Sequence, residues 1–346
     1  MAITRPCASA VKVTTWSFVG KGGETMTTTA LTIFEDGSAL DRATRLATLP
    51  EGERRRRAVE ACRDYDAGVL WEIADAWLTT YGGAGARTSA HTRRAYQRGV
   101  QDLVQAWHKG GQSLLRPPRD AGVLWVRGLE ASRRSTSTVR VRLSAARALY
   151  AALRWAGATE ADPFRDARPA RDPTPREEKR KPYTGAEMEA LLGAATPMER
   201  ALLLLAGHGG LRAQEMVDLT WADVTLDVAQ LVVQAGKGGR LRTVVMSRSL
   251  VAALRAIRPP DVAEGARVLP FDTTKTARVW MARMCARAGV TQRGVHAGRH
   301  HAGTRIVSSG GTLEAAARHL GHTSLDTTRV YVAWSDESLR ASVGEW

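Results

Sequence analysis

The chain has 346 residues, which suggests two domains at roughly 150 residues each. Apolar residues make up 44% and charged residues 25%, values typical of a globular protein with a core and not of a disordered chain. Lys and Arg outnumber Asp and Glu by 50 to 35, and the resulting net charge of +15 indicates an anionic partner, for which nucleic acid is the leading candidate.

The sequence also argues against membrane and secreted proteins. No run approaches the ~18 consecutive apolar residues that a membrane span needs, and Arg5 and Lys12 interrupt any secretory h-region near the N-terminus. Three widely spaced cysteines form no CxxC metal motif and fit a reduced cytosol. We therefore expect a cytoplasmic protein without a membrane partner.

Residues 1–66 predict a weakly structured N-terminal extension, because the stretch Lys21–Thr29 shows no hydrophobic period. The run Arg54–Arg57 falls in one short helical pattern. Such runs usually form a solvated helix face and less often a nucleic-acid contact.

Residues 67–157 predict a four-helix domain. Helical patterns begin near Val69 and Arg119 and cover 89–108 and 138–155, with apolar residues recurring at helical spacing. Arginines lie on faces away from the apolar stripes of the second and fourth helices, and we expect them to contact DNA. These are Arg94, Arg98, Arg140, Arg147 and Arg154.

Residues 158–182 predict an exposed linker, since they contain five prolines and a dense mixture of both charges. A capping box from Thr184 to Glu187 then opens a second domain over 183–346. Its helical patterns cover 198–207, 214–219, 250–258, 274–288, 299–309 and 313–320. Val224–Gly236 and Arg240–Met246, with a glycine-rich turn between them, predict a β-hairpin. The fold class expected is mainly α.

Six residues of the second domain carry the clearest functional signal through their order, although each alone has a structural explanation. They are Arg212, Lys237, His296-x-x-Arg299, Leu320-Gly-His322 and, nine residues later, Tyr331. Together with the segments GHGGLRAQEM, GKGGRLRTVV, HAGRHHAGT and HLGHTSLDTTRVYV, this order resembles the catalytic domain of the tyrosine recombinase (phage integrase) family. The helical domain is similar to that family's core-binding domain, and the two-domain layout is most similar to the Xer branch.

The resemblance implies site-specific recombination of double-stranded DNA by transesterification. Arg212 and Arg299 would clamp the scissile phosphate, because a guanidinium binds phosphate oxygens bidentately and stays charged. Lys237 would protonate the departing 5′ oxygen as a general acid. No metal or other cofactor is expected, because the two guanidiniums neutralise the phosphate.

Tyr331 would be the nucleophile and would form a 3′-phosphotyrosyl linkage. His296 would assist its deprotonation, and His322 would hydrogen-bond the phosphate. We expect the neighbouring cations to favour the phenolate and both imidazoles to titrate near neutrality without large shifts in pKa.

The resemblance further implies a two-domain clamp around DNA that works as a tetramer on two duplexes, either of identical chains or with a paralogue. An apolar face at Leu339, Val343 and Trp346 would dock either on a neighbouring protomer or on its own. The alternatives are a type IB topoisomerase and a non-catalytic DNA-binding protein. Chromosome-dimer resolution, plasmid resolution and element integration all fit the layout.

Three local features depart from this pattern. Gly298 stands where the family usually has Leu, and we expect it to loosen the helix start at Arg299. Tyr183 is a rival nucleophile that the sequence places as a linker aromatic. The pairs His300–His301 and His319–His322 would suit zinc, but no thiolate or well-placed carboxylate completes such a site, so none is expected.

Overall fold

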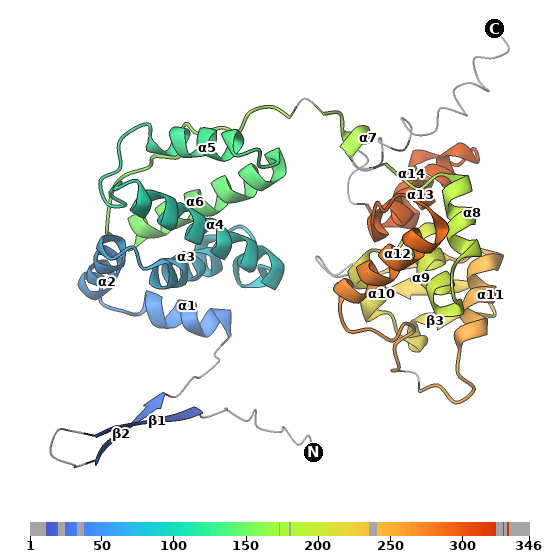
Figure 1. Ribbon diagram of the computed structural model, residues 1–346, viewed down its shortest axis with the longest axis horizontal. Coiled ribbons are helices and arrows are strands. Elements are labelled where there is room, and N and C mark those ends of the chain that lie inside the picture. The colour runs from blue at the N-terminus through green and yellow to red at the C-terminus, as the bar shows by residue number, and fades with distance from the viewer. Residues whose placement is uncertain are drawn as a thin grey trace, which may run out of the picture. The chain divides into compact units, whose positions relative to one another are not determined.

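The computed structural model describes residues 12–19, 25–32, 38–172, 174–179, 181–234, 241–263, 265–322, 328 and 331. Lys237 and the apolar tail residues Leu339, Val343 and Trp346 lie outside this part of the chain. The chain divides into two compact units, Met1–Asp172 and Pro173–Trp346 (Figure 1). Each unit has a hydrophobic core. Both are mainly helical, as predicted. None of the helices in the described ranges is long and apolar enough to cross a bilayer.

The N-terminal extension has more structure than the sequence predicts. Strands β1 (Lys12–Val19) and β2 (Thr25–Thr32) pair antiparallel, and helices α1 (Ala39–Ala47) and α2 (Glu51–Arg63) follow. The prediction of a weakly structured extension is therefore wrong for both helices, although α2 coincides with the short helical pattern around Arg54–Arg57. Helix α1 was missed. Both helices contribute to the core of the first unit through Ala43, Leu46, Ala58, Ala61 and Cys62.

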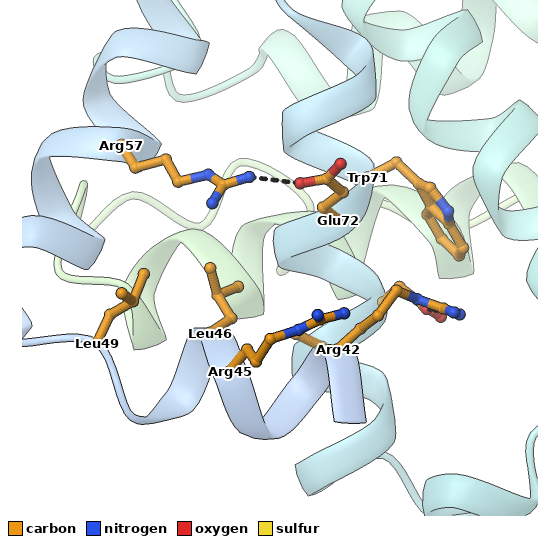
Figure 2. Close-up of a pocket in the computed structure, with 9 residues that line it drawn as sticks. Arg42, Arg45, Leu46, Leu49, Arg57, Trp71 and Glu72 are labelled. Carbon is orange, nitrogen blue, oxygen red and sulfur yellow. Dashed lines mark hydrogen bonds and ion pairs between the residues drawn. The ribbon is translucent and has the colours of Figure 1, made fainter. Parts of the chain in front are cut away.

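Two of the four arginines in the α2 run, Arg54 and Arg57, make contacts inside the unit, while Arg55 and Arg56 are exposed. The Arg54 guanidinium lies 4.7 Å from the centroid of the Trp155 ring, and Arg57 forms an ion pair of 2.5 Å with Glu72. Between α1, α2 and the next helix lies a pocket of about 550 Å³. Figure 2 shows Arg57 bridged to Glu72 across it, with Leu46 and Leu49 alongside.

The four helices predicted for residues 67–157 are confirmed. They are α3 (Ala67–Tyr81), α4 (Ala90–Lys109), α5 (Ala121–Ala131) and α6 (Thr136–Trp155). A one-turn 3₁₀ helix, Gly85–Arg87, joins α3 to α4. The rings of Trp107, Tyr150 and Phe164 pack together with centroids 5.6–5.9 Å apart at the centre of this unit.

The first part of the predicted linker belongs to this core. Phe164 and Ala167 are fully buried. A Cβ atom on Gly122 would collide with the Pro163 carbonyl oxygen, so α5 and this segment are in close contact. The linker prediction is thus wrong for these residues. The sequence looks like a linker because its many prolines and charges outnumber its single aromatic residue, Phe164, which is buried in the core. The boundary between the units, Asp172–Pro173, lies within the predicted range.

The second unit begins with the short helix α7 (Arg176–Lys179) and with α8 (Gly185–Gly193), which has the predicted capping box. The other helices are α9 (Pro197–Gly207), α10 (Ala213–Asp218), α11 (Arg248–Ile257), α12 (Thr274–Ala288), α13 (Val295–Ser308) and α14 (Leu313–Leu320). A 3₁₀ turn, Trp221–Asp223, precedes the sheet. The apolar helix α9 packs against α11 and α13 and forms the centre of this core.

The predicted hairpin is part of a small antiparallel sheet of order β3-β4-β5. Its strands are β3 (Val224–Thr225), β4 (Gln230–Val233) and β5 (Arg242–Val245), with Leu231 opposite Val244. Helix α13 begins at Val295, four residues before the predicted start. His296 and Arg299 therefore lie on one helix, about one turn apart.

Candidate active site

Among the described residues of the second unit, Arg299 is the most deeply buried charge, with 1% of its surface exposed. Its guanidinium donates to the Gly210 carbonyl, where the chain turns with φ +65°, and to the Leu320 carbonyl at 2.6 Å, at the end of α14. Burial and the nearby Arg212 lower the pKa of Arg299 to about 10. The side chain is therefore fixed between two loops and still carries its charge at neutral pH.

Arg212 is the residue that caps the N-terminus of α10, and 44% of its side chain is exposed. Its Nη1 donates to Glu215 at 2.6 Å, and its Nη2 lies 3.4 Å from the Gly321 carbonyl oxygen. Arg212 and Arg299 therefore meet the same short segment at the end of α14, one from the solvent side and one from the core.

Glu215 and Arg242 form a buried pair that the sequence reasoning missed. Arg242, in β5, donates both Nη atoms to the Glu215 carboxylate at 2.9 and 2.7 Å, and Glu215 also accepts from the Arg212 backbone at 2.8 Å. Burial raises the pKa of Glu215, but these hydrogen bonds outweigh it and lower the pKa to about 2. The sequence interpretation treated Glu215 as a local partner of Arg212. The one further sequence feature that could have indicated the pair is Arg242, a charged residue inside an otherwise uncharged strand.

Tyr331 is fully buried and lies against α13. Its hydroxyl oxygen is 3.3 Å from Nδ1 of His300, and its ring stacks on the His322 ring with centroids 6.1 Å apart. The ring occupies the space above Gly303, where a Cβ atom would lie 2.6 Å from Cζ of the phenol. A glycine at this position of α13 is what allows the phenol to approach so closely.

The electrostatics of the phenol differ from the sequence expectation. Burial raises the pKa of Tyr331, while the charges of Arg299 and Arg212 act to lower it. The cations act in the expected direction, but the effect of burial on the pKa is larger, so the expectation of a favoured phenolate is wrong for this arrangement. Arg212 and Arg299 contact the carbonyls of Gly321 and Leu320, and the next residue, His322, stacks on the Tyr331 ring, so the three side chains surround one short segment.

The two predicted histidines occupy different surroundings. His322 follows the left-handed Gly321 at the end of α14, and its Nδ1 is 3.0 Å from the Thr328 hydroxyl. Burial, with the charges of Arg299 and Arg212, lowers the pKa of His322 to about 4, so the expected absence of a large shift is wrong. His296 packs edge to face with His300, with ring centroids 4.9 Å apart.

Tyr183 and its neighbours turn out to be structural. Tyr183 is buried in the core, with its hydroxyl 3.5 Å from Cys285 Sγ, so its placement as a linker aromatic is wrong. His301 contacts the Tyr183 carbonyl at 2.8 Å.

Gly298 was expected to loosen the start of the helix that carries Arg299. A Cβ atom added to Gly298 would lie 3.0 Å from the Cβ atom of Ala206, so the glycine instead lets α13 pack closely on α9.

The five arginines predicted to contact DNA fall into two groups. Arg94, Arg98 and Arg140 are exposed. Arg147 donates to the carbonyls of Phe164 at 3.2 Å and Ala167 at 2.7 Å, and Arg154 donates to that of Ala161 at 2.9 Å. These last two arginines fasten residues 161–167 to α6.

Comparisons with known proteins agree with this architecture. Residues 183–338 match the phage integrase family, and residues 84–157 match the N-terminal SAM-like domain of phage integrases. Tyrosine recombinase XerD of Mycobacterium tuberculosis is 30% identical over 299 residues, which cover 76% of this chain and 92% of XerD. Tyrosine recombinase XerA of Thermococcus kodakarensis is 32% identical over 171 residues, covering 46% of this chain and 60% of XerA. The structure of the XerH site-specific recombinase bound to a palindromic difH substrate shares the fold, with a TM-score of 0.61 at 16% identity over 89% of this chain and 95% of XerH.

Proposed function

Because this chain belongs to the phage integrase family of tyrosine recombinases, we propose that it cuts and rejoins double-stranded DNA at specific sites by metal-independent transesterification. One observation carries the proposal. Arg212 and Arg299 come from distant parts of the sequence and both contact the Leu320–Gly321 backbone, and the adjoining His322 stacks on the Tyr331 ring. Two cations beside a tyrosine hydroxyl are the groups needed to bind a phosphodiester and attack it.

The two arginines differ in how they would serve the phosphate. Arg299 is held by two backbone carbonyls and supplies a fixed positive charge, whereas the half-exposed Arg212 can turn toward an incoming phosphate oxygen. A fixed charge needs little reorganisation as negative charge builds up in the transition state. Lys237, which lies outside the described residues, is the general acid of this proposal.

His322 would act as a neutral hydrogen-bond donor. Its lowered pKa of about 4 leaves the imidazole uncharged at pH 7. If the Thr328 hydroxyl donates to Nδ1, the remaining proton resides on Nε2 and is available to a non-bridging phosphate oxygen. The stacked Tyr331 ring would keep the imidazole in this orientation.

The first unit would supply DNA affinity through Arg94, Arg98 and Arg140, the three exposed members of the predicted set. Recombination exchanges four strands, so we propose a tetramer on two duplexes, built from this chain alone or with a paralogue. The two units would close around each duplex as a clamp. XerH, which shares the fold, was solved bound to its own DNA substrate.

The test is to trap the covalent intermediate. The protein is incubated with random genomic fragments in EDTA, and fragments that stay attached in detergent are sequenced. Nicked duplexes with the recovered sequence then serve as suicide substrates. We expect adducts from the wild-type protein and from Tyr81→Phe, an exposed tyrosine of the first unit. Tyr331→Phe should form none while binding duplex nearly as well.

Two results would contradict the proposal. An adduct that persists in Tyr331→Phe would assign the nucleophile elsewhere. Processive relaxation of supercoiled plasmid by a monomer would favour a type IB topoisomerase, since such an enzyme needs only one duplex and one copy of the site.

A further inference from the structure

We propose that His300 is a further catalytic residue, which accepts the proton of the Tyr331 hydroxyl as its oxygen attacks phosphorus. This inference rests on the proposed function above, where the resemblance assigned that task to His296. It starts from one contact: Nδ1 of His300 lies 3.3 Å from the Tyr331 hydroxyl oxygen. A general base has to lie within hydrogen-bond reach of the proton that it removes.

The contact is built into helix α13. His296, His300 and Gly303 follow one another at spacings of four and three residues, so they share one face, which we call the phenol face. Gly303 leaves room for the tyrosine ring, and His300 stands one turn earlier, where its ring centroid is 5.8 Å from that of Tyr331. His296 lies a further turn back and packs edge to face on His300.

Three other groups near the phenol, Arg299, Arg212 and His322, are poorly suited to accept its proton. Arg299 and Arg212 have no acceptor atom. His322 presents its ring face to the Tyr331 ring at an interplanar angle of 15°, and its Nδ1 is paired with Thr328. A ring face cannot accept a proton from a hydroxyl in the plane of the stacked ring, whereas Nδ1 of His300 points at the hydroxyl oxygen.

The step balances without any further reactant. The O–H bond of Tyr331 breaks as its oxygen forms the bond to phosphorus, and the proton moves to Nδ1 of His300. The bond from phosphorus to the 5′ oxygen breaks, and that oxygen takes a proton from the general acid. In rejoining, the 5′ hydroxyl attacks phosphorus and returns its proton to the now deprotonated general acid. The bond from phosphorus to the tyrosine oxygen breaks, and that oxygen recovers its proton from the His300 imidazolium. An imidazole can serve both directions near neutral pH.

The first experiment needs no DNA. The protein is labelled with ¹⁵N-histidine, and the His300 signals are assigned by their loss in His300→Asn. If Nδ1 accepts from Tyr331, Tyr331→Phe removes the hydrogen bond and shifts the Nδ1 resonance, while the His319 resonances, whose Nε2 contacts the His208 carbonyl, stay in place. An Nδ1 resonance that is the same in both proteins overturns the proposal.

The second experiment measures adduct formation on the nicked duplex recovered above. We expect His300→Ala and His300→Asn to slow cleavage at least 100-fold, with partial recovery of His300→Ala in added imidazole. A bridging 5′-phosphorothiolate, whose sulfur leaves without a proton, should restore Lys237→Ala but not His300→Ala. His108→Asn, at an exposed histidine in the other unit, should stay within twofold of wild type.

The outcomes separate this inference from the proposed function. Cleavage by His300→Ala within threefold of wild type, or its full restoration by the sulfur leaving group, would remove His300 from proton transfer and leave the recombinase assignment intact. An adduct formed by Tyr331→Phe would instead reject the assignment itself. Thermal unfolding of each variant identifies loss of fold, and the near-isosteric His300→Asn and the imidazole recovery distinguish chemistry from packing.

Discussion

At the scale of single residues, Glu215 explains how three arginines can share one small volume. Its buried carboxylate pairs with Arg242 in β5 and Arg212 in α10, and Arg299 lies 3.9 Å away. One negative charge among three positive ones lowers their mutual repulsion. It also leaves a net positive site, which suits a phosphate.

This arrangement makes stability depend on acid pH. The pKa of Glu215 is about 2 in the folded protein against 4.5 for an ordinary glutamate, so the stabilisation is complete above about pH 4.5 and is lost as the pH falls toward 2. A shift of this size corresponds to about 3 kcal/mol. Urea unfolding between pH 7 and pH 3 should therefore show a decline that is weaker in Glu215→Gln, which is itself less stable at pH 7.

Glu189→Gln is the matched control, since Glu189 is exposed on α8 of the same unit. Its unfolding free energy should follow the wild-type pH dependence. An unchanged decline in Glu215→Gln would show that other carboxylates cause it and that the buried pair contributes little.

The sequence could indicate which residues to expect at the candidate site but not their electrostatic state. The order of Arg212, Arg299 and Tyr331 along the chain was informative because the family pattern has the same order. The direction of the Tyr331 pKa depends on burial working against two cations, and burial follows from packing that no local pattern reveals. For the same reason, Glu215 was visible only as a partner of Arg212.

At the scale of elements, helix α13 organises the site through its two glycines. Gly298 faces α9 and Gly303 faces the phenol, so each removes a side chain where another element approaches closely. Helical glycines usually cost stability relative to alanine, by about 1 kcal/mol. In α13 the close contacts on both sides of the helix require glycine at these two positions in spite of this cost in stability.

Gly303→Ala tests this interpretation. The added methyl would lie 2.6 Å from the Tyr331 ring, and overpacking of this kind costs about 1–3 kcal/mol, which exceeds the helix-propensity gain of about 1 kcal/mol. We expect a net loss of unfolding free energy in the wild-type background and a gain in the Tyr331→Ala background. Chemical denaturation of the four proteins of this double-mutant cycle measures both.

Gly128→Ala provides the reference, because Gly128 is in helix α5 and a methyl group added there would meet no neighbouring side chain within 4 Å. It should raise stability by up to about 1 kcal/mol. If Gly303→Ala were equally stabilising in both backgrounds, the phenol would not occupy the space above Gly303.

Elements with strong helical periodicity were predictable, and those with short apolar sides were not. Helices α3–α6 and α12 follow clear patterns. Helix α1 buries only two of its nine residues, Ala43 and Leu46, so little apolar sequence marks it. The segment around Phe164 reads as a linker because its burial comes from α5 and α6, which are distant in sequence.

At the scale of the whole molecule, the net charge of +15 does not show which arginines are available to DNA. Three arginines of the α6 stripe recur every seven residues and look equivalent in sequence. In the folded unit, Arg147 and Arg154 bind backbone carbonyls of residues 161–167, whereas Arg140 is exposed. Only the tertiary fold divides the stripe into two structural arginines, Arg147 and Arg154, and one exposed arginine, Arg140, that can contact phosphates.

Arg140→Ala and Arg147→Ala should therefore behave in opposite ways. Removing Arg140 costs one phosphate contact, so the slope of log affinity against log salt for random-sequence duplex should fall by about 1, with unfolding free energy changed by less than about 0.5 kcal/mol. Removing Arg147 deletes charged hydrogen bonds to two carbonyls and should cost about 2 kcal/mol of stability, with the salt slope unchanged. Equal slopes in Arg140→Ala and wild type would place the DNA on another face of the unit, because an exposed guanidinium that neutralises a phosphate must release counterions when it binds.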